Sequence, residues 1–160
     1  MAATIDDVAD YIIVKLDEAR SGLSILKLQK LVYYVQAWNM ALKGRRLFDG
    51  KFEAWVHGPV NRSLYVRFAG SHSMYDLLNI KDVRPSFNID LISNYERLHI
   101  DDVLDAYVRF SGPQLESMTH DEAPWRQARG TLKLSERCEV EIDETLIASF
   151  YKKMLEDAEV

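Results

Sequence analysis

Hydrophobic residues recur every three or four positions along most of this chain, which is the spacing of one face of an α-helix. The first such stretch covers residues 4–20, where Thr4 can cap the helix and Asp7 stands three residues later, in the capping-box position. A second helix is predicted over residues 24–43, because its apolar stripe is the broadest in the chain and Gly44 can end it. We therefore expect this second helix at the centre of the core.

Residues 47–60 change from helical to alternating spacing. Asp49 and Gly50 lie between apolar residues, a pattern typical of a two-residue β-hairpin turn. We therefore predict a small hairpin that ends at residues 57–59. Pro59 suits the first turn of a helix, so a third helix is predicted directly after it.

The rest of the chain combines short helices with loops. Residues 71–88 have weak periodicity and are predicted to form a loop with one short turn at residues 75–80. Further helical stretches are predicted over residues 91–110, 113–118 and 125–129, an extended stretch over 138–142, and a last helix that Asp143 caps. The pattern predicts a mainly α protein, a compact single-domain bundle of about six helices with one small β-hairpin.

Length and composition place the chain among globular proteins. Its 160 residues suffice for one domain, so we expect residues 1–160 to form a single domain. Hydrophobic residues make up 48% and charged residues 28%, which is too apolar for a disordered chain. No stretch approaches about 18 consecutive apolar residues, and the acidic start does not resemble a secretory signal. These features predict a cytoplasmic protein without a membrane partner.

Cysteine and charge narrow the class of protein further. Cys138 is the only cysteine, which excludes an internal disulfide and a Cys-rich zinc site. The net charge of −5 argues against general nucleic-acid binding. Four arginines nevertheless lie around the predicted hairpin and third helix, either as a solvated basic face or as a patch for an acidic partner: Arg45, Arg46, Arg62 and Arg67.

Catalytic candidates are few. The chain has four histidines but no HExxH, CxxC, GxSxG or phosphate-binding glycine loop. His57 and His120 lie in dense local clusters and could act as general bases, or they could be turn histidines bonded to backbone. A metal site with Asp121 or Glu122 as third ligand would rest on a loose spacing. We expect no catalytic residue, no metal and no cofactor.

Aromatic side chains divide into two groups. Tyr33, Tyr34 and Trp38 lie on the predicted central helix, where packing into the core is expected. Trp55, Tyr65 and Trp125 lie beside turns, where an aromatic ring either covers the core or anchors a partner. The candidate partner-binding residues are Trp55, His57, Arg62, Tyr65, His120 and Trp125.

Three strings carry a resemblance in their order and spacing. They are KLQKLVYY over residues 27–34, EAWVHGPV over residues 53–60 with Tyr65, and THDEAPW over residues 119–125. Together they resemble the Panacea domain, the SocA-like antitoxin family of bacteria and phages. The likeness extends from the first predicted helix to the last, which is nearly the whole chain.

The resemblance implies a function. Family members resemble antitoxins that neutralise a protein toxin by direct contact, and the SocA type resembles a proteolytic adaptor that delivers its toxin to the ClpXP protease. Either mode is open for this chain, and the partners implied are a cognate toxin and the ClpX unfoldase. No active site carries over, so a non-enzymatic protein is expected. The alternatives are a small hydrolase using His57 or His120 and a nucleic-acid-binding regulator.

The motif residues have physical roles that need no catalysis. Gly58 and Pro59 can turn the chain from hairpin into helix. Thr119 can cap a turn while Glu122 reaches back to its backbone. Pro124 can begin the next helix and place Trp125 on its inner side. The motifs are therefore expected to build the scaffold, whereas the loop at residues 71–88 is a candidate contact region.

Overall fold

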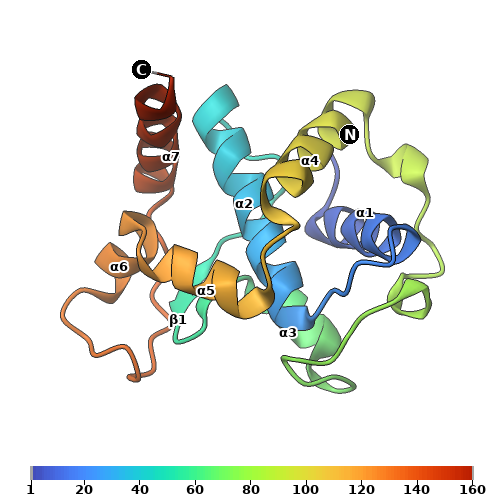
Figure 1. The fold of residues 1–160 in the computed structure, drawn as a ribbon, viewed down its shortest axis with the longest axis horizontal. Coiled ribbons are helices and arrows are strands. Elements are labelled where there is room, and N and C mark those ends of the chain that lie inside the picture. Colours follow the sequence, from blue (N-terminus) through green and yellow to red (C-terminus); the bar gives the residue numbers. More distant parts are fainter. Residues whose placement is uncertain (1, 160) are drawn as a thin grey trace.

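The computed structural model describes residues 2–159, over which the chain forms seven α-helices, one two-stranded antiparallel sheet and two short 3-10 helices (Figure 1). The mainly α prediction is confirmed, with one helix more than expected. None of these helices combines the length and apolarity that crossing a membrane requires. The elements are α1 (Ile5–Glu18), α2 (Ile25–Lys43), β1 (Glu53–Trp55), β2 (Gly58–Val60), α3 (Arg62–Ala69), η1 (Ile80–Asp82), η2 (Ile89–Leu91), α4 (Asn94–Tyr107), α5 (Gly112–His120), α6 (Ala123–Arg129) and α7 (Glu144–Ala158).

Helix α2 passes through the middle of the molecule, as its apolar stripe predicted, and packs against α1, α4, α5 and α7 (Figure 1). Fifteen of its 19 residues are buried, so its polar side chains must find partners inside the protein. The Gln36 amide meets this need by donating to Phe48 O at 2.7 Å and accepting from Leu47 N at 2.8 Å. The central helix therefore fixes the path of the segment that follows it.

Helix ends agree with the predicted caps. Thr4 and Asp7 form the expected capping box at α1, and the Ser24 hydroxyl accepts from Lys27 N at the start of α2. Gly44 ends α2 in the left-handed conformation with φ of 69°. Asp143 caps α7 through Thr145 N. Each of these contacts spans at most four residues, which is why local sequence is sufficient to predict it.

The hairpin turn differs from the prediction. Residues 56–57 connect β1 to β2, with Trp55 opposite Gly58, whereas Asp49 and Gly50 lie in the preceding loop. The backbone before Asp49 is bonded to the Gln36 side chain and so is not available to a second strand. The outer edge of β1 instead pairs with the stretch predicted to be extended, because Ala54 N donates to Val140 O at 2.8 Å.

Pro59 lies within β2 and does not begin a helix. Helix α3 starts at Arg62 after Asn61, whose side chain accepts from Leu64 N. The Gln29 amide holds Asn61 extended, since it accepts from Asn61 N at 3.0 Å and donates to Asn61 O at 3.1 Å. This clamp from α2 places the start of the helix three residues later than the proline suggested.

The loop predicted over residues 71–88 extends to residue 92. The turn predicted at residues 75–80 lies earlier, where Asp76 N donates to Ser73 O at 3.1 Å, and the loop also contains η1 and η2. The helix predicted from residue 91 begins at Asn94, after a capping box of Ser93 and Glu96. Several apolar side chains of the loop remain exposed: Tyr75, Leu77, Ile80, Ile89 and Leu91.

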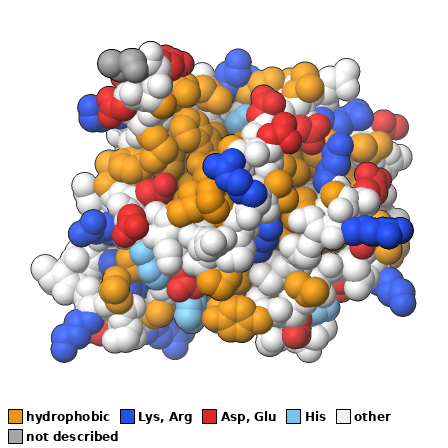
Figure 2. All heavy atoms as spheres, in the orientation of Figure 1, with side chains coloured by type: hydrophobic (Ala, Val, Ile, Leu, Met, Phe, Trp, Pro, Cys, Tyr) orange, Lys and Arg blue, Asp and Glu red, His pale blue; other side chains and the backbone are white. Residues whose placement is uncertain are grey.

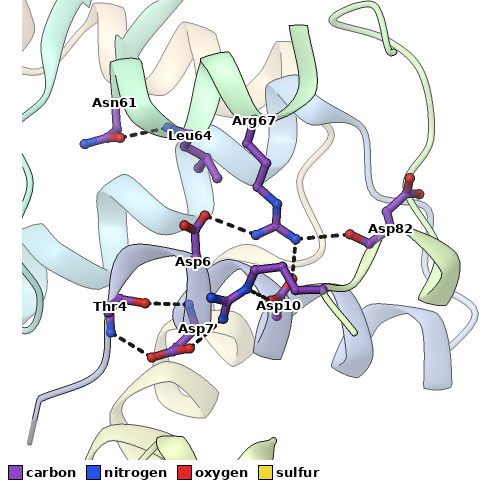
Figure 3. Close-up of polar contacts among 9 residues, drawn as sticks. Thr4, Asp6, Asp7, Asp10, Asn61, Leu64, Arg67 and Asp82 are labelled. Atoms are coloured by element: carbon purple, nitrogen blue, oxygen red, sulfur yellow. Dashed lines mark hydrogen bonds and ion pairs between the residues drawn. The ribbon is translucent and has the colours of Figure 1, made fainter. Parts of the chain in front are cut away.

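An ion-pair network ties this loop to α1 (Figure 3). The Asp10 carboxylate, with a fully buried side chain, is bonded to the guanidinium groups of Arg67 and Arg84, the latter through Nε at 2.6 Å. Arg84 also reaches Asp7 Oδ1 at 2.5 Å, and Arg67 reaches Asp6 Oδ1 at 3.2 Å. Two arginines distant in sequence therefore converge on one face of α1.

Candidate functional site

The three sequence strings meet at the hairpin. From α2, the Gln29 amide holds Asn61, and Lys30 Nζ donates to Pro59 O at 3.2 Å. From the α5–α6 junction, the His120 ring lies 2.9 Å from Val56 O through Nε2. The first and third strings thus hold the second string from two sides, which fixes the hairpin turn in place.

Trp125 reinforces this arrangement from beneath the hairpin. Its Nε1 donates to Trp55 O at 2.8 Å, and its ring stacks on His120 with centroids 4.0 Å apart. Pro124 lies in the first turn of α6, and the Trp125 side chain points inward as predicted, with 2% exposed. Burial lowers the pKa of His120, which favours a neutral ring that donates to the Val56 carbonyl. Both residues therefore support the hairpin and offer little surface to a partner.

The predicted cap of Thr119 with Glu122 reaching back to its backbone is wrong. Glu122 Oε1 accepts from the hydroxyls of Tyr34 and Tyr151, each at 2.8 Å, while Thr119 Oγ1 donates to Glu116 O. Buried hydroxyl groups require acceptors, and this carboxyl supplies one to two of them. Burial raises the pKa of Glu122 to about 7 although both tyrosines act in the opposite direction.

This raised pKa predicts a pH dependence of stability. The folded protein keeps the Glu122 proton up to about pH 7, whereas the unfolded chain releases it near the ordinary value of 4.5. The stability contributed by this proton is therefore present below pH 4.5 and is lost as the pH rises through about 7. Because Glu122→Gln does not titrate, its free energy of unfolding relative to wild type should increase by about 2 kcal/mol between about pH 5.5 and 8.

Urea unfolding of the two proteins at both pH values measures this difference. The buried Lys30 also titrates, but it is common to both chains and so affects the comparison little. A difference between the two proteins that stays constant with pH would show that Glu122 is ionised throughout.

Lys30 is fully buried below the hairpin. Burial lowers the pKa of its amine to about 7, and Pro59 O is its hydrogen-bond partner. Gly58 lies directly over it with φ of 99°, and a Cβ at this position would come within 2.5 Å of Lys30 Cε and 2.9 Å of Thr119 Oγ1. The glycine of the second string is therefore required by both its conformation and its neighbours.

His57 is the exposed residue of the hairpin turn. Its Nδ1 lies 3.0 Å from Glu116 Oε1 on α5, with 48% of the histidine side chain exposed. A His–carboxylate pair can orient an imidazole as a general base, but such a base needs a substrate group within reach. Over residues 2–159, no three His, Cys, Asp or Glu side chains are grouped so that they could hold a metal ion.

A pocket of about 460 Å³ lies beside the hairpin, and we call it the hairpin pocket. It brings together four of the six predicted partner-binding residues: Trp55, His57, Arg62 and Tyr65. Trp55 packs edge-on against Tyr65 with centroids 5.0 Å apart, and the Arg62 guanidinium lies 5.3 Å from the Trp55 ring centroid. Its other lining residues are Ile25, Leu26, Gln29, Lys30, Val56, Val60, Phe68, Ala69, His72, Ser73, Met74, Arg137, Cys138 and Glu139.

Sequence reasoning missed Lys30 and Cys138 as lining residues of this pocket. The lysine occurs within the most apolar helix, which is an unusual position for a charge. The predicted group of arginines is divided in the structure, because Arg46 pairs with Glu144, Arg62 with Glu53 and Arg67 with α1. The structure therefore contains no basic face shared by these three residues.

A second, shallower pocket of about 170 Å³ lies between α2 and α4. Trp38, Leu42 and Tyr107 line it, and Trp38 Nε1 donates to the Tyr107 hydroxyl at 2.8 Å. Trp38 is thus only partly in the core, unlike its neighbours Tyr33 and Tyr34. Figure 2 shows hydrophobic side chains gathered on this face of the molecule, over α7 and the adjacent part of α2.

These features define a helical domain in which interior motif residues hold a hairpin beside a pocket. The chain belongs to the family described as Antitoxin SocA-like, Panacea domain, whose sequence pattern matches residues 28–126. This match confirms the resemblance carried by the three strings. The chain is also 32% identical over 124 residues to Antitoxin SocA of Caulobacter vibrioides (strain NA1000 / CB15N). That similarity covers 74% of this chain and 66% of the relative, just under two thirds of its length. No solved structure gives a significant match.

Proposed function

We propose that this protein is an antitoxin that binds a cognate protein toxin and neutralises it by direct contact. Family membership supports the antitoxin role. The observation that carries the contact mode is the hairpin pocket, where the partly exposed Trp55 meets the exposed Tyr65 and Arg62. These three residue types are the most frequent hot spots of protein interfaces. The contact set consists of Trp55, His57, Arg62 and Tyr65, with His120 and Trp125 supporting them from below.

A proteolytic adaptor would need a second contact surface for the protease. We propose the α2–α4 pocket for this role, because it is apolar and shares no lining residue with the hairpin pocket. Holding toxin and protease together would raise the local toxin concentration to the mM range. In this mode the toxin's half-life in cells depends on both ClpXP and the antitoxin.

Co-expression with the product of the adjacent gene tests the proposal. The tagged protein should co-purify with that product, and the product should inhibit growth when expressed alone. A toxin half-life that lengthens when ClpX is removed would support the adaptor mode, whereas an unchanged half-life would support binding alone. The antitoxin proposal fails if the folded protein captures no neighbour and the neighbour is harmless.

His57→Ala separates this proposal from the hydrolase alternative. The histidine is half exposed and its bond to Glu116 links two surface groups, so the fold should survive the change. A binding antitoxin should still neutralise its toxin, with at most a modest loss of affinity. A hydrolase that uses His57 as a base should lose its effect altogether. Growth in the presence of the toxin measures the outcome, with circular dichroism as the control for folding.

A further inference from the structure

The hairpin pocket has the size and lining of a ligand site. Its volume of about 460 Å³ lies within the range usual for pockets that hold a large side chain or small molecule. Trp55, Tyr65, Val60 and Phe68 give it apolar and aromatic walls. Tyr65 is 44% exposed, so part of this wall is open to solvent.

Cationic groups outnumber carboxylates among the residues that line this pocket. Arg62 and Arg137 carry full positive charges and Glu139 is the single lining carboxylate, whereas the buried Lys30 and the two histidines add positive charge only when protonated. The whole chain carries a net charge of −5, so this region differs from the protein as a whole. The two arginines of the pocket therefore offer cationic partners to an acidic group of a ligand.

The ion pairs at the rim are oriented with their cations outward. The Arg62 side chain is 49% exposed, whereas its partner Glu53 is 16% exposed. Arg137 is likewise 86% exposed against 42% for Glu139. The Glu53 carboxylate thus lies behind the Arg62 guanidinium, and in both pairs the cation is the more exposed partner that an approaching ligand meets first.

The anchor residues are held in place before any ligand arrives. Arg62 is bonded to Glu53 at 2.8 Å and to Glu139 at 3.3 Å, and it lies against the Trp55 ring. Trp55 Nε1 also donates to Glu53 Oε1 at 2.9 Å. Side chains that are already ordered lose less conformational entropy when they bind, which increases affinity.

We infer that the hairpin pocket binds a segment of the partner protein in which a large apolar or aromatic side chain stands beside an Asp or Glu. The apolar side chain packs against the aromatic wall that Trp55 and Tyr65 form together, and the carboxylate pairs with Arg62. This inference rests on the proposed function for the identity of the partner as the toxin. A nucleic acid would also offer rings and negative charge, but a continuous phosphate backbone would need cations well beyond this pocket, which the net charge of −5 disfavours.

Affinity measurements on the purified protein and the adjacent gene's product test the inference. Arg62→Ala and Tyr65→Ala should each weaken binding about 10- to 100-fold, because both truncate an anchor of the pocket. The matched controls are Lys153→Ala, an exposed cation paired with Asp157, and Leu98→Ala, an exposed apolar residue on α4. Both controls should change affinity less than about threefold.

Overlapping peptides that cover the partner's sequence identify the bound segment. Peptides with an apolar residue beside an Asp or Glu should compete with the intact partner, and replacing that acid by Asn or Gln should abolish the competition. The Arg62→Ala protein should bind the acidic peptide and its Asn or Gln version equally. If Arg62 had a purely structural role, the variant would still distinguish the two peptides.

The outcomes separate the two proposals. Failure of the wild-type protein to bind the neighbour's product would contradict the proposed function itself. Tight binding by wild type and by both pocket variants would overturn the inference while leaving the antitoxin role intact. Competition by a single-stranded oligonucleotide, without competition by any acidic peptide, would also overturn it.

Discussion

Replacing Gly58 with alanine should lower the free energy of unfolding by about 3 kcal/mol or more. The left-handed conformation alone disfavours any side chain at this position. In addition, the new Cβ would clash with Lys30 Cε, which cannot move aside easily because the lysine is fully buried and bonded to Pro59 O. The hairpin would then have to shift away from α2. Urea unfolding followed by circular dichroism measures the loss.

Gly70→Ala is the control for this substitution. Gly70 ends α3 with φ of −80°, and a Cβ there meets no atom within 4 Å. Alanine should therefore change stability by no more than about 1 kcal/mol, in either direction. Equal effects of the two substitutions would contradict the close packing of the hairpin on Lys30. Gly58 lies within the part of the chain that matches the family, and a large loss would explain its role there without any contact to a toxin.

Asp10→Ala should lower the free energy of unfolding by about 3–5 kcal/mol. The Asp10 side chain is fully buried and is bonded to both Arg67 and Arg84. Its removal leaves two partly buried guanidinium groups facing each other without their common anion, and such a loss costs far more than the pair itself contributes. The loop that carries Arg84 should also be held less firmly against α1, through Asp7 alone, and faster hydrogen exchange of residues 78–84 would detect this change.

Asp6→Ala is the matched control within the same network. Asp6 contacts Arg67 alone, with 35% of its side chain exposed, so its loss should cost at most about 1 kcal/mol. Similar losses for Asp6→Ala and Asp10→Ala would mean that burial of the Asp10 carboxylate contributes little. Unchanged exchange in the loop would likewise contradict its attachment through Arg84.

The parts of the fold that could be predicted from sequence depend on short-range contacts. Thr4 with Asp7, Gly44 at the end of α2 and Asp143 at the start of α7 were all assigned correctly because each cap acts within about one helical turn. The broad apolar stripe of α2 was equally informative, since a helix that is apolar on most sides can bury those sides only at the centre of the protein.

The errors arose where a distant side chain decides the local structure. Asp49 and Gly50 form a favourable hairpin turn in isolation, but the Gln36 amide captures the backbone beside them. Pro59 suits a helix start, but the Gln29 amide holds Asn61 extended. Neither glutamine can be identified as the partner from the spacing of residues in the sequence, because the sequence of a helix does not show which backbone groups its glutamine side chains will bind.

The candidate site shows the same division between local and distant contacts, so only part of it could be predicted. Trp55, His57, Arg62 and Tyr65 follow one another along the chain, so their shared pocket could be anticipated from the hairpin and the helix after it. The inward positions of His120 and Trp125 depend on bonds to Val56 and Trp55 across more than 60 residues. Aromatic residues beside turns look alike in sequence whether they cover a core or face a partner.

Helix α3 has a small buried face and a large exposed face, and this arrangement bears on how new partner specificities can arise. Only Leu64 and Phe68 of its eight residues are buried, and five are exposed: Arg62, Ser63, Tyr65, Val66 and Ala69. The interior clamps act on the segment before this helix, and Arg67 ties the helix to α1, so its position does not depend on burying the five exposed side chains. A library varied at these five codons alone is therefore a practical route to retargeted antitoxins, since it changes the recognition surface and leaves the core unchanged.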